Sequence, residues 1–134
     1  MKRILWLLVA LTVMAAGLVG CSRYVSRYSA VGFVHSNDSD SAFMTFVRFD
    51  GQMVFKLKCD SEKEAQIQYS GQLEEGSITV YYDCGETKKE LFTLGAGNEI
   101  ESSGGDLSGK TVYIIVETSE KCKNGKLDFE ICYE

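Results

Sequence analysis

Apolar and polar residues alternate with a period of two through the body of this 134-residue chain, and this alternation restricts the possible folds more than any other feature. Met53, Phe55 and Leu57 point to one side of an extended segment, and Lys56 and Lys58 point to the other. Such alternation is typical of a β-strand with one buried and one solvated face. No stretch of the body keeps a helical spacing of apolar residues for long. The pattern therefore predicts an all-β protein.

Turn residues divide the body into eight extended runs. The chain has no proline, so its turns must be made by Gly, Asn and Asp. Eight short strands at this spacing predict a single antiparallel β-sandwich or jelly roll over residues 29–134. The predicted strands are Ala30–His35, Ala42–Phe49, Met53–Cys59, Ala65–Ser70, Ser77–Asp83, Glu90–Leu94, Thr111–Thr118 and Leu127–Tyr133.

Two dipeptides predict hairpin turns. Asp50-Gly51 is the stronger signal, because both residues tolerate the positive φ that a tight hairpin turn requires. Asn124-Gly125, just before Leu127, is the second. The segment Gly95–Gly109 is rich in Gly and Ser, and it predicts a long loop that carries one short edge strand around Ile100.

Residue parity assigns side chains to the two faces of each strand. In the run Thr111–Thr118, Tyr113 and Ile115 are apolar on the side opposite to the core, so we expect this strand to be central and covered on both faces. Tyr81 and Asp83 are predicted to lie outside. The inward-facing residues predicted for the core are Met53, Phe55, Leu57, Ile67, Tyr69, Ile78, Val80, Tyr82, Val112, Ile114, Val116, Leu127, Phe129 and Ile131.

From Met53 onward, extended runs are separated by Glu75-Gly76, Cys84-Gly85 and Asn124-Gly125. This pattern is similar to that of small jelly-roll modules of secreted bacterial proteins, such as pre-peptidase C-terminal-like domains. The similarity covers about 80 residues and concerns the pattern only. It implies a jelly-roll fold and carries no implication about activity.

The amino-terminal segment combines a positive start, Lys2 and Arg3, with an apolar stretch and the run Leu18-Val19-Gly20-Cys21. This arrangement resembles the signal peptide and lipobox of bacterial lipoproteins. The resemblance implies that residues 1–20 are removed and that Cys21 carries a diacylglycerol, with residues 21–28 as a membrane-proximal linker. It also implies an extracytoplasmic protein anchored to a bacterial membrane, at the cell surface or in the outer membrane.

Two alternatives to a lipoprotein signal are weaker. An uncleaved transmembrane anchor needs about 20 apolar residues, and the run Ile4–Val19 is shorter. Ordinary secretory cleavage is the second alternative, since Ala15-Ala16-Gly17 also offers small residues, but the length, the flanking residues and Cys21 together favour a lipoprotein. We therefore expect the protein to be held by lipid.

Net charge restricts the possible partners. Without residues 1–20, twelve basic and nineteen acidic residues remain, which is a net charge of −7 and argues against nucleic-acid binding. Arg23 and Arg27 follow the lipid-bearing cysteine directly, where they either contact anionic headgroups or remain solvated. We expect a monomer whose partners are the membrane and one unidentified protein or glycan.

Four cysteines remain beyond Cys21, and export to an oxidising environment would allow them to form disulfides. In a simple meander Cys59 and Cys84 end strands that run in the same direction, so this pair is the preferred disulfide. The remaining pair, Cys122 and Cys132, could then form a second bridge. Four free thiols are an open alternative. A zinc site is not expected, because no closely spaced cysteine pair exists and the chain has one histidine.

Catalytic signals are weak, so we expect neither an enzyme nor a bound cofactor or metal. His35 is the sole histidine, and no Gly-x-Ser-x-Gly motif surrounds any serine. The acidic pairs Glu74-Glu75 and Glu99 with Glu101 are typical of solvated turns. The segment 37–41, Asn-Asp-Ser-Asp-Ser, could ligate calcium, but it lacks the pattern of an EF-hand and favours a hairpin turn.

Binding remains the favoured class of function. An exposed Tyr81, together with Tyr113, could stack on a sugar or contact a protein, although packing across strands is the commoner role of half-buried tyrosines. The main hypothesis is a lipid-anchored, non-enzymatic β-sandwich with a binding or envelope-associated role. The alternative is a tethered inhibitor or ligand-capture protein that uses the loop 95–109. A hydrolase is the weakest hypothesis.

Overall fold

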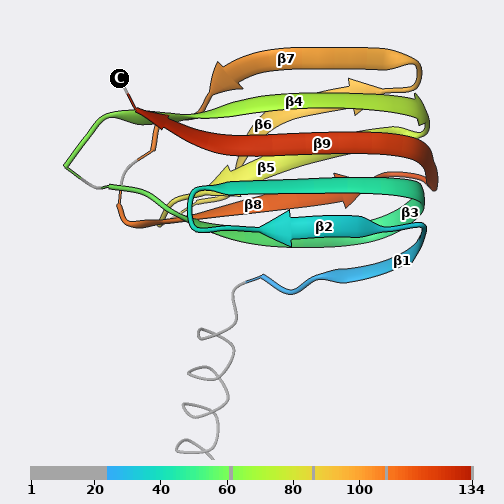
Figure 1. Cartoon of the computed structure of the whole chain (residues 1–134), viewed down its shortest axis with the longest axis horizontal. Helices are drawn as coiled ribbons and strands as arrows, with labels where there is room; N and C mark the ends of the chain where they lie inside the picture. The colour runs from blue at the N-terminus through green and yellow to red at the C-terminus, as the bar shows by residue number, and fades with distance from the viewer. Residues whose placement is uncertain (1–23, 61, 86, 108, 134) are drawn as a thin grey trace, which may run out of the picture.

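The computed structural model describes residues 24–60, 62–85, 87–107 and 109–133 (Figure 1). These residues form nine β-strands and no helix, so none of them belongs to a helix able to cross a bilayer. The strands are β1 (Arg27–Val31), β2 (Val34–Asn37), β3 (Ser41–Lys58), β4 (Ala65–Glu75), β5 (Ser77–Asp83), β6 (Lys89–Gly95), β7 (Asn98–Gly104), β8 (Thr111–Thr118) and β9 (Cys122–Tyr133).

Strand β3 belongs to two layers because it bends back on itself at Asp50 and Gly51. Its first half pairs with β2 and β9, and its second half pairs with β8. After the bend, the N–H of Lys58 donates a hydrogen bond of 2.6 Å to the carbonyl oxygen of Ser39. The two ends of the strand therefore meet, as its turning ribbon in Figure 1 shows.

The bend produces a two-layer β-sandwich. Layer A contains β2, the first half of β3, β9, β4 and β7, and layer B contains the second half of β3, β8, β5 and β6. Along the chain from the first half of β3 to β9, only the connection from β5 to β6 stays within one layer. Every other connection crosses to the opposite layer. This is the connectivity of a jelly roll, so the predicted fold class is confirmed.

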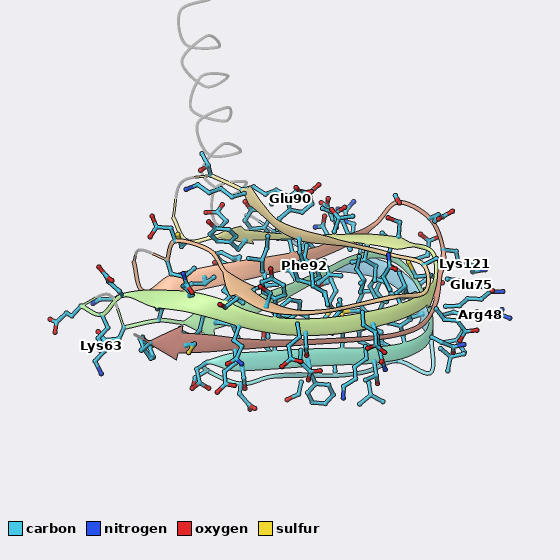
Figure 2. All side chains as sticks on the ribbon, turned by 90° about the horizontal axis from the view of Figure 1, so that it is seen from above. Arg48, Lys63, Glu75, Glu90, Phe92 and Lys121 are labelled. Atoms are coloured by element: carbon cyan, nitrogen blue, oxygen red, sulfur yellow. The ribbon has the colours of Figure 1, made fainter. Side chains whose placement is uncertain are left out.

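The core lies between the inward faces of the two layers. The ring of Phe92 in layer B stacks on that of Tyr69 in layer A, with centroids 4.4 Å apart. The rings of Phe55 and Phe129 face each other across the same core at 6.1 Å. Figure 2 shows Phe92 between the layers, with Arg48, Glu75 and Lys121 at the end where β3 bends and Lys63 at the opposite end. Fully burying one such aromatic side chain contributes about 1.5–3 kcal/mol.

The inward-facing residues predicted from parity are all buried, so that part of the prediction is confirmed. The strand β8 lies between β3 and β5, and Ile115 on its outer side is fully buried, as expected for a central strand covered on both faces. One residue needs a correction. Asp83 lies on the outer face, as predicted, but only 1% of it is exposed, because Tyr24 covers it.

The turn predictions need two corrections. At Asp50-Gly51 the chain does reverse, but the arms on either side join different layers and do not pair with each other. Strand β1 crosses this bend, and a Cβ on Gly51 would overlap the backbone of Arg27. Asn124-Gly125 makes no hairpin, because β9 runs through it with Asn124 at a φ of 50° and the ring of Phe46 directly against Gly125.

The edge strand expected near Ile100 in the segment 95–109 is present, because β7 covers residues 98–104 and pairs with β4 at the end of the sheet. One segment boundary differs from the prediction. The linker expected over residues 21–28 is partly folded, because Tyr24 packs on the domain and β1 begins at Arg27. The arginine Arg27 is exposed, whereas Cys21 and Arg23 lie outside the described residues.

Candidate functional site

The outward side chains of three neighbouring strands in layer A form a continuous polar surface. Strand register places them in three rows that run across the strands: Glu130-Gln68-Ser103, Asp128-Ser70-Glu101 and Lys126-Gln72-Glu99. The polar face, as we name this surface, consists of Gln66, Gln68, Ser70, Gln72, Glu99, Glu101, Ser103, Lys126, Asp128 and Glu130. Its inward neighbours Ile67, Tyr69 and Phe129 are buried, so the core fixes the position of the rows.

The polar face is hollowed at its centre. Ser70 and Gly71 are small, and the longer side chains of β7 and β9 stand on either side of them. The result is a depression of about 290 Å³ and an adjoining one of about 270 Å³ that reaches Phe43 of β3. The two hollows share Ser70, Glu101 and Asp128, so they form a single shallow groove.

Charge on the polar face is strongly one-sided. Four carboxylates, those of Glu99, Glu101, Asp128 and Glu130, stand against one ammonium group, that of Lys126. The ammonium group lies 3.9 Å from the Asp128 carboxylate, and both side chains are about half exposed. An exposed ion pair of this kind contributes little stability. The carboxylates therefore remain accessible to a ligand.

The pair Tyr81 and Tyr113 does lie on one outer face, that of layer B, but neither ring is an open platform. Lys88 places its Nζ 4.2 Å from the ring centroid of Tyr81 and pairs with Glu117 at 2.7 Å. The ring of Tyr24 packs on that of Tyr113 at 5.5 Å. Packing within the protein, which the sequence favoured, accounts for both tyrosines.

Among the residues that the structure describes, no disulfide joins any two of the cysteines Cys59, Cys84, Cys122 and Cys132. Cys59 follows β3 and Cys84 follows β5, and β8 lies between those strands, so the backbones are separated by about two strand spacings, roughly 10 Å. A disulfide joins Cα atoms that are about 4.4–6.8 Å apart. The preferred bridge would therefore require movement of the strand ends.

The second bridge proposed from sequence is incompatible with the fold. Cys122 and Cys132 stand near opposite ends of the continuous strand β9. Ten residues of extended chain span about 33 Å. No bridge between them can form within one chain, because the predicted last hairpin at Asn124-Gly125 does not exist.

Burial perturbs two of the thiols. It raises the pKa of the Cys122 thiol, which is fully buried and donates a hydrogen bond of 3.3 Å to the carbonyl of Glu120. It also raises the pKa of the Cys59 thiol, an effect partly offset by a hydrogen bond with Tyr133. Thiolates are the nucleophilic form of cysteine, so both groups are suppressed as nucleophiles.

The catalytic and metal candidates are scattered over the fold. His35 is exposed on β2, with its ring at the edge of Phe33 at 4.9 Å. The candidate calcium segment 37–41 forms the β2–β3 turn. The side-chain amide of Asn37 donates a hydrogen bond of 2.9 Å to the carbonyl of Lys56 and accepts one of 3.0 Å from its N–H. Within the part of the chain that the structure describes, no three acidic, histidine or cysteine side chains gather as metal ligands.

Of the two acidic pairs that the sequence assigns to solvated turns, one belongs to the polar face. Glu99 and Glu101 lie on β7 and join the polar face, whereas Glu74 accepts a hydrogen bond from Asn124 and Glu75 pairs with Lys123 at 3.4 Å. Sequence reasoning missed the polar face as a whole. The available signal was the repeated outward Gln on β4, at Gln66, Gln68 and Gln72.

The sequence matches no protein-family model and no curated protein. Solved structures with a similar course of the chain include TmCBM61 in complex with β-1,4-galactotriose, at 11% identity over 81% of this chain and 88% of that chain, with a TM-score of 0.49. Another is PliG of Aeromonas hydrophila, a periplasmic inhibitor of g-type lysozyme, at 12% identity over 70% and 88% of the two chains, with a TM-score of 0.45.

A third similar structure is a family 29 carbohydrate-binding module complexed with mannohexaose, at 10% identity over 81% of this chain and 91% of that chain, with a TM-score of 0.41. Because the identities are 10–12% and every TM-score is below 0.5, these similarities support no conclusion about this chain, and the ligands of these proteins do not transfer to it. The resemblance to pre-peptidase C-terminal-like modules remains a prediction. The strand connectivity shows an all-β jelly roll, and its site must be judged from its own residues.

Proposed function

We propose that this protein is a lipid-anchored, non-enzymatic module outside the cytoplasm that captures a positively charged ligand on the polar face. The observation that carries the proposal is the set of four carboxylates around the shallow groove centred on Ser70. Complementary charge speeds encounter and selects partners. The outward amides of Gln68 and Gln72 add hydrogen-bond donors and acceptors, which the hydroxyl or amide groups of a ligand can use.

The ligand chemistry is a chain that bears ammonium or guanidinium groups. Two sources present such groups at a cell envelope: a basic polypeptide and a glycan with free amino groups. Anionic polymers are disfavoured, because they would meet Glu101 and Asp128 on either side of the groove. The alternative of a tethered inhibitor assumed a flexible contact loop over residues 95–109, but residues 98–104 form strand β7. This strand contributes Glu99 and Glu101 to the polar face.

Binding rather than turnover is supported by the surroundings of the one histidine. A general base needs a hydrogen-bonded partner and a substrate pocket. His35 instead lies exposed beside Phe33, and neither hollow of the groove is lined by it. The lipid anchor rests on the run Leu18-Val19-Gly20-Cys21, which resembles a lipobox.

The ligand is tested by calorimetric titration of the unlipidated domain with poly-lysine, chitosan oligosaccharides and neutral β-1,4-galactan. We expect binding to at least one cationic probe and a fall in affinity as salt is raised, because screening weakens exposed charge pairs. The double variant Glu101→Gln, Asp128→Asn should weaken binding by about tenfold or more, since roughly 1.4 kcal/mol corresponds to tenfold.

The matched control is Glu62→Gln, Glu120→Gln, which changes the net charge equally at two exposed turn positions outside the polar face. Equal losses in the two double variants would mean that net charge alone attracts the probes. Tighter binding of galactan than of either cationic probe would reject the ligand class. Poly-lysine and chitosan distinguish the polypeptide source from the glycan source.

The anchor is tested separately by intact mass spectrometry of the protein from its native membrane. We expect a chain that begins at Cys21 and carries the mass of a diacylglyceryl group. An unmodified chain that begins at Met1 would reject the anchor and leave the ligand experiment unaffected.

A further inference from the structure

We propose that the outer face of layer B lies against the membrane surface and that the polar face on layer A points away from it. This inference rests on the proposed lipid at Cys21. It names an interaction surface and its partner, a phospholipid headgroup layer. Three observations carry it: a clamp at the amino terminus of the domain, the length of chain before the clamp, and the distribution of charge over the two outer faces.

The clamp consists of Tyr24, Val25 and Ser26. The hydroxyl of Tyr24 donates a hydrogen bond of 2.5 Å to Asp83 at the end of β5, and its ring packs on Tyr113 of β8. The N–H of Val54 in β3 donates to Ser26 Oγ at 2.9 Å. The three residues thus cross the outer face of layer B from β5 to β3, over the region where Ile115 is fully buried.

The chain before the clamp is too short for the domain to turn over. Cys21 and Tyr24 are joined by three peptide units, which span at most about 11 Å. The headgroup region on each side of a bilayer is about 5–8 Å thick, from the difference between its total and hydrocarbon thickness. The lipid can therefore reach the hydrocarbon only if the face that bears Tyr24 lies close to the headgroups. The polar face is one layer spacing of about 10 Å farther away, plus its side chains.

Charge favours the same orientation. The outer face of layer B carries Lys56, Lys58 and Lys88, and against them stand Glu117, which pairs with Lys88, Glu90 beside Thr93, and the buried Asp83. The basic and acidic groups of this face therefore balance. The polar face carries four carboxylates and one ammonium group. Anionic lipids attract basic residues held near the surface by about 1 kcal/mol each and repel carboxylates. Turning the polar face outward also leaves it open to a ligand that approaches from outside the membrane.

Tryptophan reporters test the orientation, because the only tryptophan of the chain, Trp6, lies in the segment that processing would remove. Thr93→Trp places the reporter on the outer face of layer B, and Gln72→Trp places it on the polar face; both positions are exposed. The full-length lipidated variants are reconstituted into phosphatidylethanolamine–phosphatidylglycerol vesicles that contain a headgroup-attached dansyl acceptor. We expect energy transfer to be at least about twofold stronger from the Thr93 position, because the faces are separated by more than about 10 Å.

A lengthened tether supplies the control. About ten Gly and Ser residues inserted between Arg23 and Tyr24 leave the clamp intact but make the linker flexible, so the difference between the two reporters should largely disappear. Equal transfer from both reporters in the lipidated protein with its natural tether would overturn the orientation while leaving the anchor in place. The variant Cys21→Ser should not stay on the vesicles. If the unsubstituted protein is also released from them and mass spectrometry finds no lipid on it, the proposed anchor is overturned.

Discussion

The hydroxyl of Tyr24 donates a hydrogen bond of 2.5 Å to the carboxylate of Asp83, which lies 59 residues farther along the chain. Asp83 also accepts a bond of 2.9 Å from the N–H of Gly85, and only 1% of the residue is exposed. Burial of a charged group is costly unless hydrogen bonds compensate for lost hydration. The amino-terminal segment and the end of β5 therefore depend on each other.

Removal of this hydroxyl tests that dependence. We expect Tyr24→Phe to lower the free energy of unfolding by about 1–3 kcal/mol, because the buried carboxylate loses a charge-assisted hydrogen bond. Urea denaturation followed by circular dichroism measures the change. Tyr28→Phe is the matched control, since Tyr28 is 44% exposed and keeps its ring stacked on Phe33. A loss in Tyr24→Phe no larger than that in the control would contradict the role assigned to the hydroxyl.

The bend of β3 depends on Gly51. Its φ is 134°, and β1 passes so close that an added Cβ would overlap the carbonyl oxygen of Arg27. We expect Gly51→Ala to destabilise the protein by about 2 kcal/mol or more, through backbone strain and overpacking. In Gly104→Ala the nearest atom to the new Cβ would be 3.6 Å away, an ordinary contact, so this variant should be nearly neutral. Thermal unfolding compares the two, and equal shifts in Tm would be inconsistent with strain at the bend.

Thiol reactivity should follow burial. Cys132 is exposed, and we expect it to react with iodoacetamide first, whereas Cys59 and Cys122 react slowly because burial raises their pKa. Time-resolved peptide mapping of the native protein measures the order. Faster labelling of Cys122 than of Cys132 would show that the end of β9 opens in solution.

The same pKa shifts fix the sign of a pH dependence. The folded protein holds the thiol protons of Cys59 and Cys122 more tightly than the unfolded chain, whose thiols titrate near 9.0. The free energy of unfolding should therefore keep this contribution below pH 9 and lose it as the pH rises through the raised pKa values. Urea titrations across this range should show a shallower fall for Cys122→Ala, and identical slopes would exclude this thiol as the cause.

The number of free thiols, and therefore of disulfides, can be measured directly. Because β8 separates the strands that lead to Cys59 and Cys84, we expect four reactive thiols after denaturation without reductant. Alkylation followed by intact mass measurement gives the number. Two reactive thiols and a Cys59–Cys84 cross-linked peptide would show that the ends of β3 and β5 approach each other in the native protein.

The period of two predicted the inward residues of both layers from sequence, because successive side chains of an extended chain must point to opposite sides. Val112, Ile114 and Val116 are fully buried as their parity required, and Ile115 on the other side marked β8 as a strand covered on both faces. The dipeptide Asp50-Gly51 likewise predicted that the chain reverses its direction there. Whether its two arms pair or separate into layers depends on β8 and β9, which lie more than 50 residues away along the chain.

The candidate site follows the same division. The residue types of the polar face and their outward direction are visible along β4, where Gln68 and Gln72 alternate with Tyr69 and Leu73. Which carboxylates flank them is set by the register with β7 and β9, and that register brings Glu101 and Asp128 to either side of Ser70. Local sequence could not pair these strands, because strand pairing is a contact between distant segments.

The amino-acid sequence by itself determined the all-β class and the faces of the strands, because each depends on neighbouring residues and on backbone geometry; the lipid anchor stays a prediction from residues 1–21. Only the tertiary structure decided that β3 serves both layers, that Tyr24 buries Asp83 and that three strands assemble one acidic face. Those features arise where segments far apart in the chain bury a common core, and the free energy of that burial selects their partners.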